Sequence, residues 1–201
     1  MSNPIVEDFL RINGRDLESV EFCYSEDSNI NRPEGFDEAS LRVLFVFLSP
    51  GVTRSVSNTF TVLHHYLKER MGDSVFVDFC YLPTQKDLKV YQKVGMSFLF
   101  GAASHQMWKD FDVVCISISI LPEIWNVPSI FWQNSIPLAY QDRMEDESIP
   151  LIITGGTCST FLDCAYGQVG DDPEKTTLMD GVMVGHAEVG LDKILSVTWI
   201  S

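Results

Sequence analysis

Positive charge is scarce in this chain. Its 201 residues hold 14 Lys and Arg against 28 Asp and Glu, so the formal net charge is −14. A stripe of Lys and Arg is what displaces counterions from nucleic-acid phosphates and attracts anionic lipid, and this composition excludes such a surface. We therefore expect no nucleic-acid partner and no attachment to an anionic membrane.

Long apolar runs are also missing. No stretch approaches the roughly 18 apolar residues that a membrane-spanning helix needs. Residues 1–10 lack the basic segment and the apolar core of a secretory signal. The sequence therefore predicts a cytoplasmic protein with no membrane partner.

Cysteines are few, and their spacing matches no known ligand set. The five cysteines at 23, 80, 115, 158 and 164 form an odd set without a CxxC pair. Cys80 and Cys115 lie inside apolar, strand-like runs. We expect buried free thiols in a reducing compartment, with no disulfide framework and no metal bound by cysteine.

Catalytic motifs are absent as well. The first strand candidate is followed by Pro50 and Gly51 without the further glycines of a dinucleotide fingerprint. No GxxxxGK[ST] phosphate loop and no GxSxG nucleophile elbow occurs. His64 and His65 are adjacent on a helix candidate and point about 100° apart, so they cannot readily share a metal. We expect no catalytic residue and no metal site in this chain.

From residue 41 onward, short apolar runs alternate with helix-length segments. The strand candidates are 41–48, 74–82, 112–120, 151–154 and 181–184. Strands that alternate with helices build βαβ units with right-handed crossovers. We predict an α/β domain of the Rossmann-like, flavodoxin-like type, with a doubly wound, mostly parallel five-stranded sheet and helices on both faces.

The first forty residues differ from the rest. They hold ten acidic residues against three arginines, which is half of the net charge in a fifth of the chain. Within them, 4–12 is a helix candidate whose Ile5, Phe9 and Ile12 recur about one turn apart. We predict an acidic N-terminal arm, 1–40, that packs on an α/β domain spanning 41–201; a disordered tail is the alternative.

Small and polar residues gather where the predicted strands end. In open parallel sheets, ligands bind at the carboxyl ends of the strands, beside the point where crossovers leave to opposite faces. Glycines let a ligand approach the backbone, and serines donate hydrogen bonds without bulk. The strand exits hold Ser49, Gly51, Ser117, Ser119, Gly155, Gly156, Thr157 and Gly185. We predict a ligand crevice there; a tight turn is the alternative explanation of the glycine pair.

The order of these segments resembles a known family. A serine-containing strand with Ser117 and Ser119, then the pair Gly155 and Gly156, then a last strand that ends at 185–188, follow one another along the chain. The whole pattern, over about 41–195, resembles the cobalamin-binding-type N-terminal domain of radical S-adenosylmethionine (radical SAM) enzymes.

The resemblance implies a role for each group of residues. Ser117 and Ser119 would line the corrin or the nucleotide-tail side of cobalamin. Gly155 and Gly156 would let the tail pass the backbone, and Gly185 with Glu188 would close the last strand exit. The resemblance therefore implies cobalamin as the candidate cofactor.

Two departures from the family pattern concern that cofactor. The DxHxxG motif, which places a histidine below cobalt, is absent, because none of the four histidines is preceded by Asp at the required position. His186 stands where the first Glu of the family's final motif is expected. The resemblance thus implies cobalamin binding without a protein histidine on cobalt, with the loop 50–58 below the corrin.

Radical chemistry would need a partner. Radical SAM enzymes carry CxxxCxxC for a [4Fe-4S] cluster in a barrel domain, and no such motif occurs up to Ser201. The iron-sulfur cluster and S-adenosylmethionine would therefore belong to that barrel. We expect a non-catalytic accessory domain whose partner is a radical SAM barrel or another protein.

Two other functions remain open. The fold could serve as a cofactor-free interaction module through the aromatic stretch 124–132, although its helical spacing also fits a buried helix face. A small hydrolase or transferase could use His186 and Glu188 as an acid/base pair, because both follow the last strand.

Overall fold

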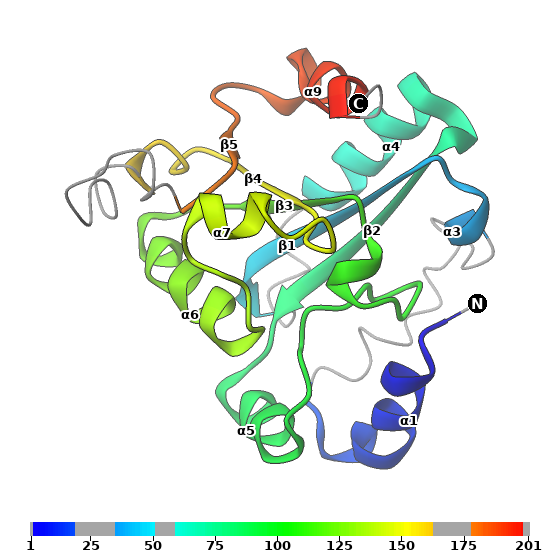
Figure 1. Cartoon of the computed structure of the whole chain (residues 1–201), viewed down its shortest axis with the longest axis vertical. Helices are drawn as coiled ribbons and strands as arrows, with labels where there is room; N and C mark the ends of the chain where they lie inside the picture. The colour runs from blue at the N-terminus through cyan, green and yellow to red at the C-terminus, as the bar shows by residue number, and fades with distance from the viewer. Residues whose placement is uncertain (1, 19–34, 51–58, 163–177, 199–201) are drawn as a thin grey trace.

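The computed structural model describes residues 2–18, 35–50, 59–162 and 178–198. Its centre is a five-stranded sheet in the order β2-β1-β3-β4-β5, in which all neighbouring strands are parallel (Figure 1). The strands are β1 (Leu41–Pro50), β2 (Val75–Leu82), β3 (Val113–Ser117), β4 (Leu151–Gly155) and β5 (Gly181–Val182). The predicted flavodoxin-like α/β architecture is confirmed.

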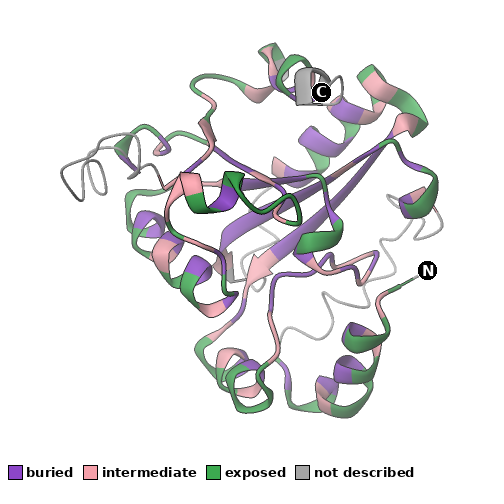
Figure 2. Ribbon diagram, viewed as in Figure 1, coloured by how far each residue is buried: buried purple, intermediate pink, exposed green. Residues whose placement is uncertain are grey.

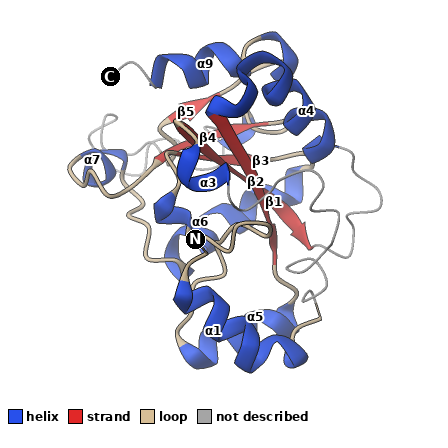
Figure 3. Ribbon diagram, turned by 90° about the vertical axis from the view of Figure 1, so that its right-hand side faces the viewer, coloured by secondary structure: helices blue, strands red, loops and turns tan. Residues whose placement is uncertain are grey.

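Helices cover both faces of this sheet. The longer ones are α1 (Pro4–Asn13), α4 (Thr59–Met71), α5 (Gln85–Val94), α6 (Asn126–Gln133) and α9 (Leu191–Thr198). Figures 1 and 3 show α4 and α9 on one face and α1, α5 and α6 on the other. Short helical segments make up the remaining described elements: η1 (Gly14–Asp16), α3 (Gly35–Glu38), η4 (Gly72–Ser74), η5 (Trp108–Asp110), η6 (Leu121–Trp125), α7 (Tyr140–Met144) and η8 (Ala187–Val189).

The sheet divides the apolar core into two layers, as the interior strand β1 shows. Phe45 and its alternate neighbours pack with Leu63 of α4 and Leu195 of α9. Leu44 and its alternates pack with Phe131 of α6 on the opposite face. A strand buried on both faces needs apolar residues at every position, which explains the unbroken apolar run in β1. Figure 2 shows buried residues along the strands and on the helix surfaces turned toward them.

Two strands are shorter than their apolar runs. β3 ends at Ser117, although the Ile118 N–H still donates to the Gly155 carbonyl of β4 at 2.8 Å. Ile118 is nevertheless fully buried. β5 pairs with β4 over only two residues, Gly181 and Val182. Both apolar runs extend beyond the paired residues into exposed positions, since Ile120 and Val184 are 54% and 73% exposed.

The helix α1 lies in the predicted place but presents a different face. Asn3 caps it through a hydrogen bond from the Ile5 N–H to Asn3 Oδ1 at 3.0 Å. Phe9 stacks on Tyr91 of α5 at 4.8 Å between ring centroids and is buried, as are Val6 and Leu10. The predicted apolar face of Ile5, Phe9 and Ile12 is wrong, because Ile5 and Ile12 are exposed and the helix is turned so that Val6 and Leu10 meet the core.

Further sequence predictions concern thiols and membrane spans. Cys80 and Cys115 are buried free thiols, as predicted, and Cys158 is also free. Cys23 and Cys164 lie outside the described residues. No helix within the described ranges combines the length and the apolar character needed to cross a bilayer.

Candidate functional site

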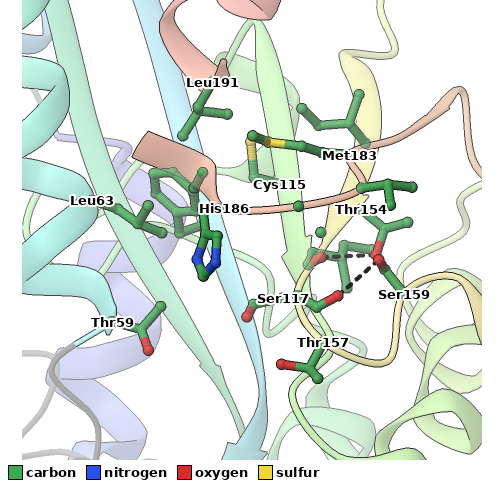
Figure 4. Close-up of a pocket in the computed structure, with 18 of the residues that line it drawn as sticks. Thr59, Leu63, Cys115, Ser117, Thr154, Thr157, Ser159, Met183, His186 and Leu191 are labelled. Atoms are coloured by element: carbon green, nitrogen blue, oxygen red, sulfur yellow. Dashed lines mark hydrogen bonds between the residues drawn. The ribbon is translucent and has the colours of Figure 1, made fainter. Parts of the chain in front are cut away.

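A cavity of about 740 Å³ opens at the carboxyl ends of β3, β4 and β5 and beside Phe45 of β1, on the face that α4 and α9 cover (Figure 4). Its position follows from the topology. The crossover after β1 runs through α4 on one face, and the crossover after β3 runs through α6 on the other. The adjacent ends of β1 and β3 are therefore the switch point at which open α/β sheets bind ligands.

The cavity has apolar walls and a polar edge. Phe45, Leu63, Ile153, Met183 and Leu191 are among the apolar residues that line it. Hydroxyl groups from Thr59, Ser117, Thr157 and Thr160 and the imidazole of His186 supply the polar part. A few polar groups at the edge of an apolar pocket of this size are typical of a small-molecule site.

The structure brings together most of the sequence-predicted site residues. Ser117, Gly155, Gly156, Thr157 and Gly185 line the cavity. Gly51 and most of the loop 50–58 lie outside the described residues, and so does the side chain of Glu188 in η8. Their proposed roles stay predictions.

Ser49 and Ser119 lie elsewhere and share one partner, the buried carboxylate of Glu123 in η6. The Ser49 hydroxyl donates to Glu123 Oε1 at 2.6 Å, and the Ser119 N–H donates to Oε2 at 2.6 Å. The Ile120 N–H also donates to Oε2, at 3.2 Å. Neither serine is among the described residues that line the cavity. The arrangement ties the end of β1 to the end of β3.

The glycine pair after β4 has two different environments. A Cβ atom on Gly156 would lie 2.4 Å from the Ile118 carbonyl oxygen, and Gly156 has φ +106°. Only glycine fits there, because the turn packs directly against the backbone beyond β3. A Cβ atom on Gly155 would make only ordinary contacts with Met183, so Gly155 leaves more room beside the cavity.

Charge is almost absent from the described lining. No Asp, Glu, Lys or Arg is among the described residues around the cavity. Cys115 lies beneath it, and burial raises the pKa of its thiol far enough to keep it protonated at neutral pH. Within the described residues there is also no cluster of three His, Cys, Asp or Glu that could hold a metal ion.

Sequence reasoning missed the wall that the helices contribute. Thr59 and Leu63 of α4 and Leu191 of α9 line the cavity, together with His186 at its edge. The helical spacing showed that Leu63 is buried but not that it would lie beside a ligand site. The sequence had offered His186 as one half of an acid/base pair with Glu188; His186 lines the cavity, and the side chain of Glu188 lies outside the described residues.

The fold and the cavity define this chain as an open, all-parallel α/β domain with a cavity at its strand exits. A family model described as the N-terminal region of radical SAM proteins matches residues 59–199, more than half of the chain. The chain belongs to this family, which confirms the resemblance at that level. No curated protein and no solved structure matches the chain.

Proposed function

We propose that this domain binds a small-molecule cofactor or substrate for a radical SAM barrel and does not catalyse a reaction by itself. The observation that carries the proposal is the cavity of about 740 Å³ at the carboxyl ends of three parallel strands, β3, β4 and β5. Membership of the radical SAM N-terminal family supports the kind of partner. Cobalamin is the candidate ligand.

The residues around the cavity fit one part of cobalamin, its nucleotide tail. A cavity of this volume is in the range of roughly 300–1,000 Å³ that holds a drug-sized group. Phe45, Leu63 and Ile153 would pack against the base of the tail, and the hydroxyls of Ser117 and Thr157 would hydrogen-bond its polar part. When bound, the cofactor supplies a cobalt centre that carries an alkyl group; the chain holds and orients it.

The cofactor would be held without a protein histidine on cobalt. The missing DxHxxG motif supports this expectation. In an electron paramagnetic resonance spectrum of the reduced, cobalamin-loaded protein, a nitrogen splitting that changes when the protein is labelled with ¹⁵N would contradict the expectation. The label is needed because the benzimidazole of the cofactor's own tail also gives nitrogen splitting when it coordinates cobalt. His186 is the one histidine among the described residues of the cavity, so a His186 variant would then be compared with the wild type.

Titration with hydroxocobalamin tests the proposal. The protein should retain about one equivalent through a sizing column, with a shifted absorption spectrum. Thr157→Trp, which places an indole in the cavity, should lower the affinity at least roughly tenfold because it removes the space for the ligand. Thr61→Trp is the matched control, since Thr61 is exposed on α4 and is not among the residues that line the cavity.

Failure of the wild-type protein to retain hydroxocobalamin at high micromolar concentration would reject cobalamin as the ligand. Equal affinity of the Thr157→Trp variant and the wild type would reject this cavity as the binding site.

A second candidate function, protein interaction, is favoured by one observation. Trp125 and Trp132 are 69% and 81% exposed. Their neighbours Ile124, Val127 and Phe131 are buried, so the aromatic stretch is only partly core. Exposed aromatic residues are enriched at protein interfaces.

The two functions predict opposite outcomes for one pair of variants. If the domain serves only as an interaction module, Trp132→Ser should weaken association with a radical SAM barrel protein, and Thr157→Trp should not. If ligand binding is the function, Trp132→Ser should leave retention of hydroxocobalamin unchanged.

A further inference from the structure

We infer that His186 gives the cavity a preference for ligands that carry a phosphate group, and that this preference increases as the pH falls. The inference rests on the proposed function, because it takes the cavity to be a ligand site, and it names the ligand chemistry. A phosphate occurs both in the nucleotide tail of cobalamin and in free nucleotides. The experiments below separate these two sources.

The first argument is the distribution of acidic residues. The chain has 28 Asp and Glu, twice its number of Lys and Arg. None of the described residues around the cavity is acidic. A carboxylate in the wall would repel a phosphate, so the described wall offers an anion a neutral surface inside an otherwise acidic protein.

The second argument is the position of the imidazole. Gly185 has φ +115°, and a Cβ atom there would meet nothing within 4 Å, so the backbone before His186 turns in a way that favours glycine. Figure 4 shows the imidazole between Leu63 on one side and Ser117 on the other, with Thr157 on the far side of the same space. His186 thus shares the cavity with two hydroxyl donors.

The third argument is the direction of α4. This helix has 13 residues and begins at Thr59, which lines the cavity beside His186. The partial positive charge and the N–H groups at a helix N-terminus favour an anion. The helix therefore adds to the preference that the imidazole and the hydroxyls create.

The pH dependence follows from the chemistry of histidine. A histidine side chain ordinarily gains its positive charge between pH 8 and pH 5, and the charged ring donates hydrogen bonds from both nitrogens. Cys115 stays neutral in this range because burial raises the pKa of its thiol. Asp192 of α9 accepts a hydrogen bond from Tyr66 of α4 at 2.8 Å and is not among the described lining residues.

Two pairs of probes test the phosphate preference. The first pair is hydroxocobalamin and the corresponding cobinamide, which lacks the nucleotide tail and its phosphate. The second pair is adenosine 5′-monophosphate and adenosine. Affinities are measured by absorption for the corrinoids and by calorimetry for the nucleotides, at pH 5.5 and pH 8.

We expect at least one phosphate-bearing probe to bind roughly fivefold more tightly at pH 5.5 than at pH 8, about the effect of one partly exposed charge-assisted hydrogen bond. The phosphate-free member of the same pair should show no such change. His186→Gln should abolish the pH dependence. His65→Gln, the same change at an exposed site on α4 that is not among the lining residues, should preserve it.

Glu188→Gln tests whether the acidic neighbour of His186 in η8, and not His186 itself, causes the pH dependence. This variant should also preserve the pH dependence. The inference is overturned if neither phosphate-bearing probe binds, or if the pH dependence survives in His186→Gln. Tight binding of hydroxocobalamin with no pH effect would overturn the inference and leave the proposed function standing. Binding of the mononucleotide alone, with the pH effect, would support the inference and reject cobalamin as the ligand.

Discussion

Arg143 and Asp180 form an ion pair in the interior of the protein, with both side chains almost fully buried. Arg143 Nε and Nη2 donate to Asp180 Oδ1 at 2.9 and 2.6 Å. Its Nη1 donates to the carbonyls of Pro137 and Leu138, each at 2.8 Å. The other carboxylate oxygen of Asp180 accepts the Ile152 N–H at 2.6 Å. The pair thus connects α7 to the edge of the sheet.

Replacing Arg143 by Lys should destabilise the protein even though it keeps the charge. A single ammonium group cannot supply both the fork to Asp180 and the two carbonyl contacts, so buried acceptors lose their partners. We expect the free energy of unfolding to fall by about 2–4 kcal/mol, measured by urea denaturation.

Arg11→Lys is the control for this substitution. Arg11 pairs with Asp8 at 3.0 Å, but its side chain is 70% exposed. Such surface pairs contribute little, so the loss should stay below about 0.5 kcal/mol. Similar losses for the two variants would show that the buried pair contributes no more than a surface one.

At the scale of the element, α1 is attached to the rest of the domain by polar contacts as well as by its apolar face. Glu7 Oε1 lies 2.7 Å from His105 Nδ1, and the Asn3 N–H donates to the His105 carbonyl at 3.3 Å. The hydrogen bond to His105 holds the pKa of the Glu7 carboxyl below its ordinary value. The attachment of α1 therefore depends on pH.

The sign of this dependence follows from the lowered pKa of Glu7. Its contribution to stability is fully present above the unfolded value of about 4.5 and is lost as the pH falls through the folded value. At pH 7, Glu7→Gln should cost about 0.5 kcal/mol, because the side chain is partly exposed. The free energies of unfolding of the variant and the wild type should become equal at acidic pH.

Hydrogen exchange of the α1 amides, measured at pH 7 and near pH 3.5, checks this prediction. Glu69→Gln, at an exposed position of α4, should not change the exchange of α1. A constant difference between wild type and Glu7→Gln at both pH values would contradict the role given to the charge.

The sequence predicted the strands well because a parallel strand covered on both faces must be apolar at nearly every position. The sequence was less informative at positions where a contact with a distant part of the chain determines which residue is buried. Asp78 stands in the middle of β2 and is fully buried, where its carboxylate accepts the N–H groups of Phe79, Ala103 and Ser104. Nothing local in the run 74–82 reveals donors some 25 residues away.

The same contrast applies to the site. Ser117 and Gly155 were predictable because the carboxyl ends of parallel strands meet at one edge of the sheet. Ser49 was assigned to the ligand by the same rule, but its hydroxyl donates to Glu123, which is 74 residues further along the chain. A position at the end of a strand places a residue at the ligand-binding edge of the sheet. The side chains that reach this edge from the helical segments determine which groups the residue contacts.

At the scale of the whole molecule, the net charge of −14 creates self-repulsion that the fold must overcome. Added salt screens this repulsion, because the Debye length falls from about 30 Å at 0.01 M to about 8 Å at 0.15 M. We expect Tm at pH 7.5 to rise with NaCl over this range, measured by thermal denaturation followed by circular dichroism.

The control is the same series of NaCl concentrations at a pH near the isoelectric point of about 4.5, where the net charge is close to zero. The effect of salt on Tm should largely vanish there. A Tm that is independent of salt at pH 7.5 would mean that the acidic residues lie too far apart to repel one another effectively.

The contact between Gly156 and the Ile118 carbonyl bears on how relatives of this protein are grouped. Since any side chain at 156 would collide with the backbone beyond β3, a protein with the same turn must keep this glycine whatever ligand it binds, or none. A glycine at this position after the fourth strand is therefore inherited with the architecture and survives a change of ligand. If His186 holds the ligand as proposed, the residue at its position should instead vary among relatives with the ligand.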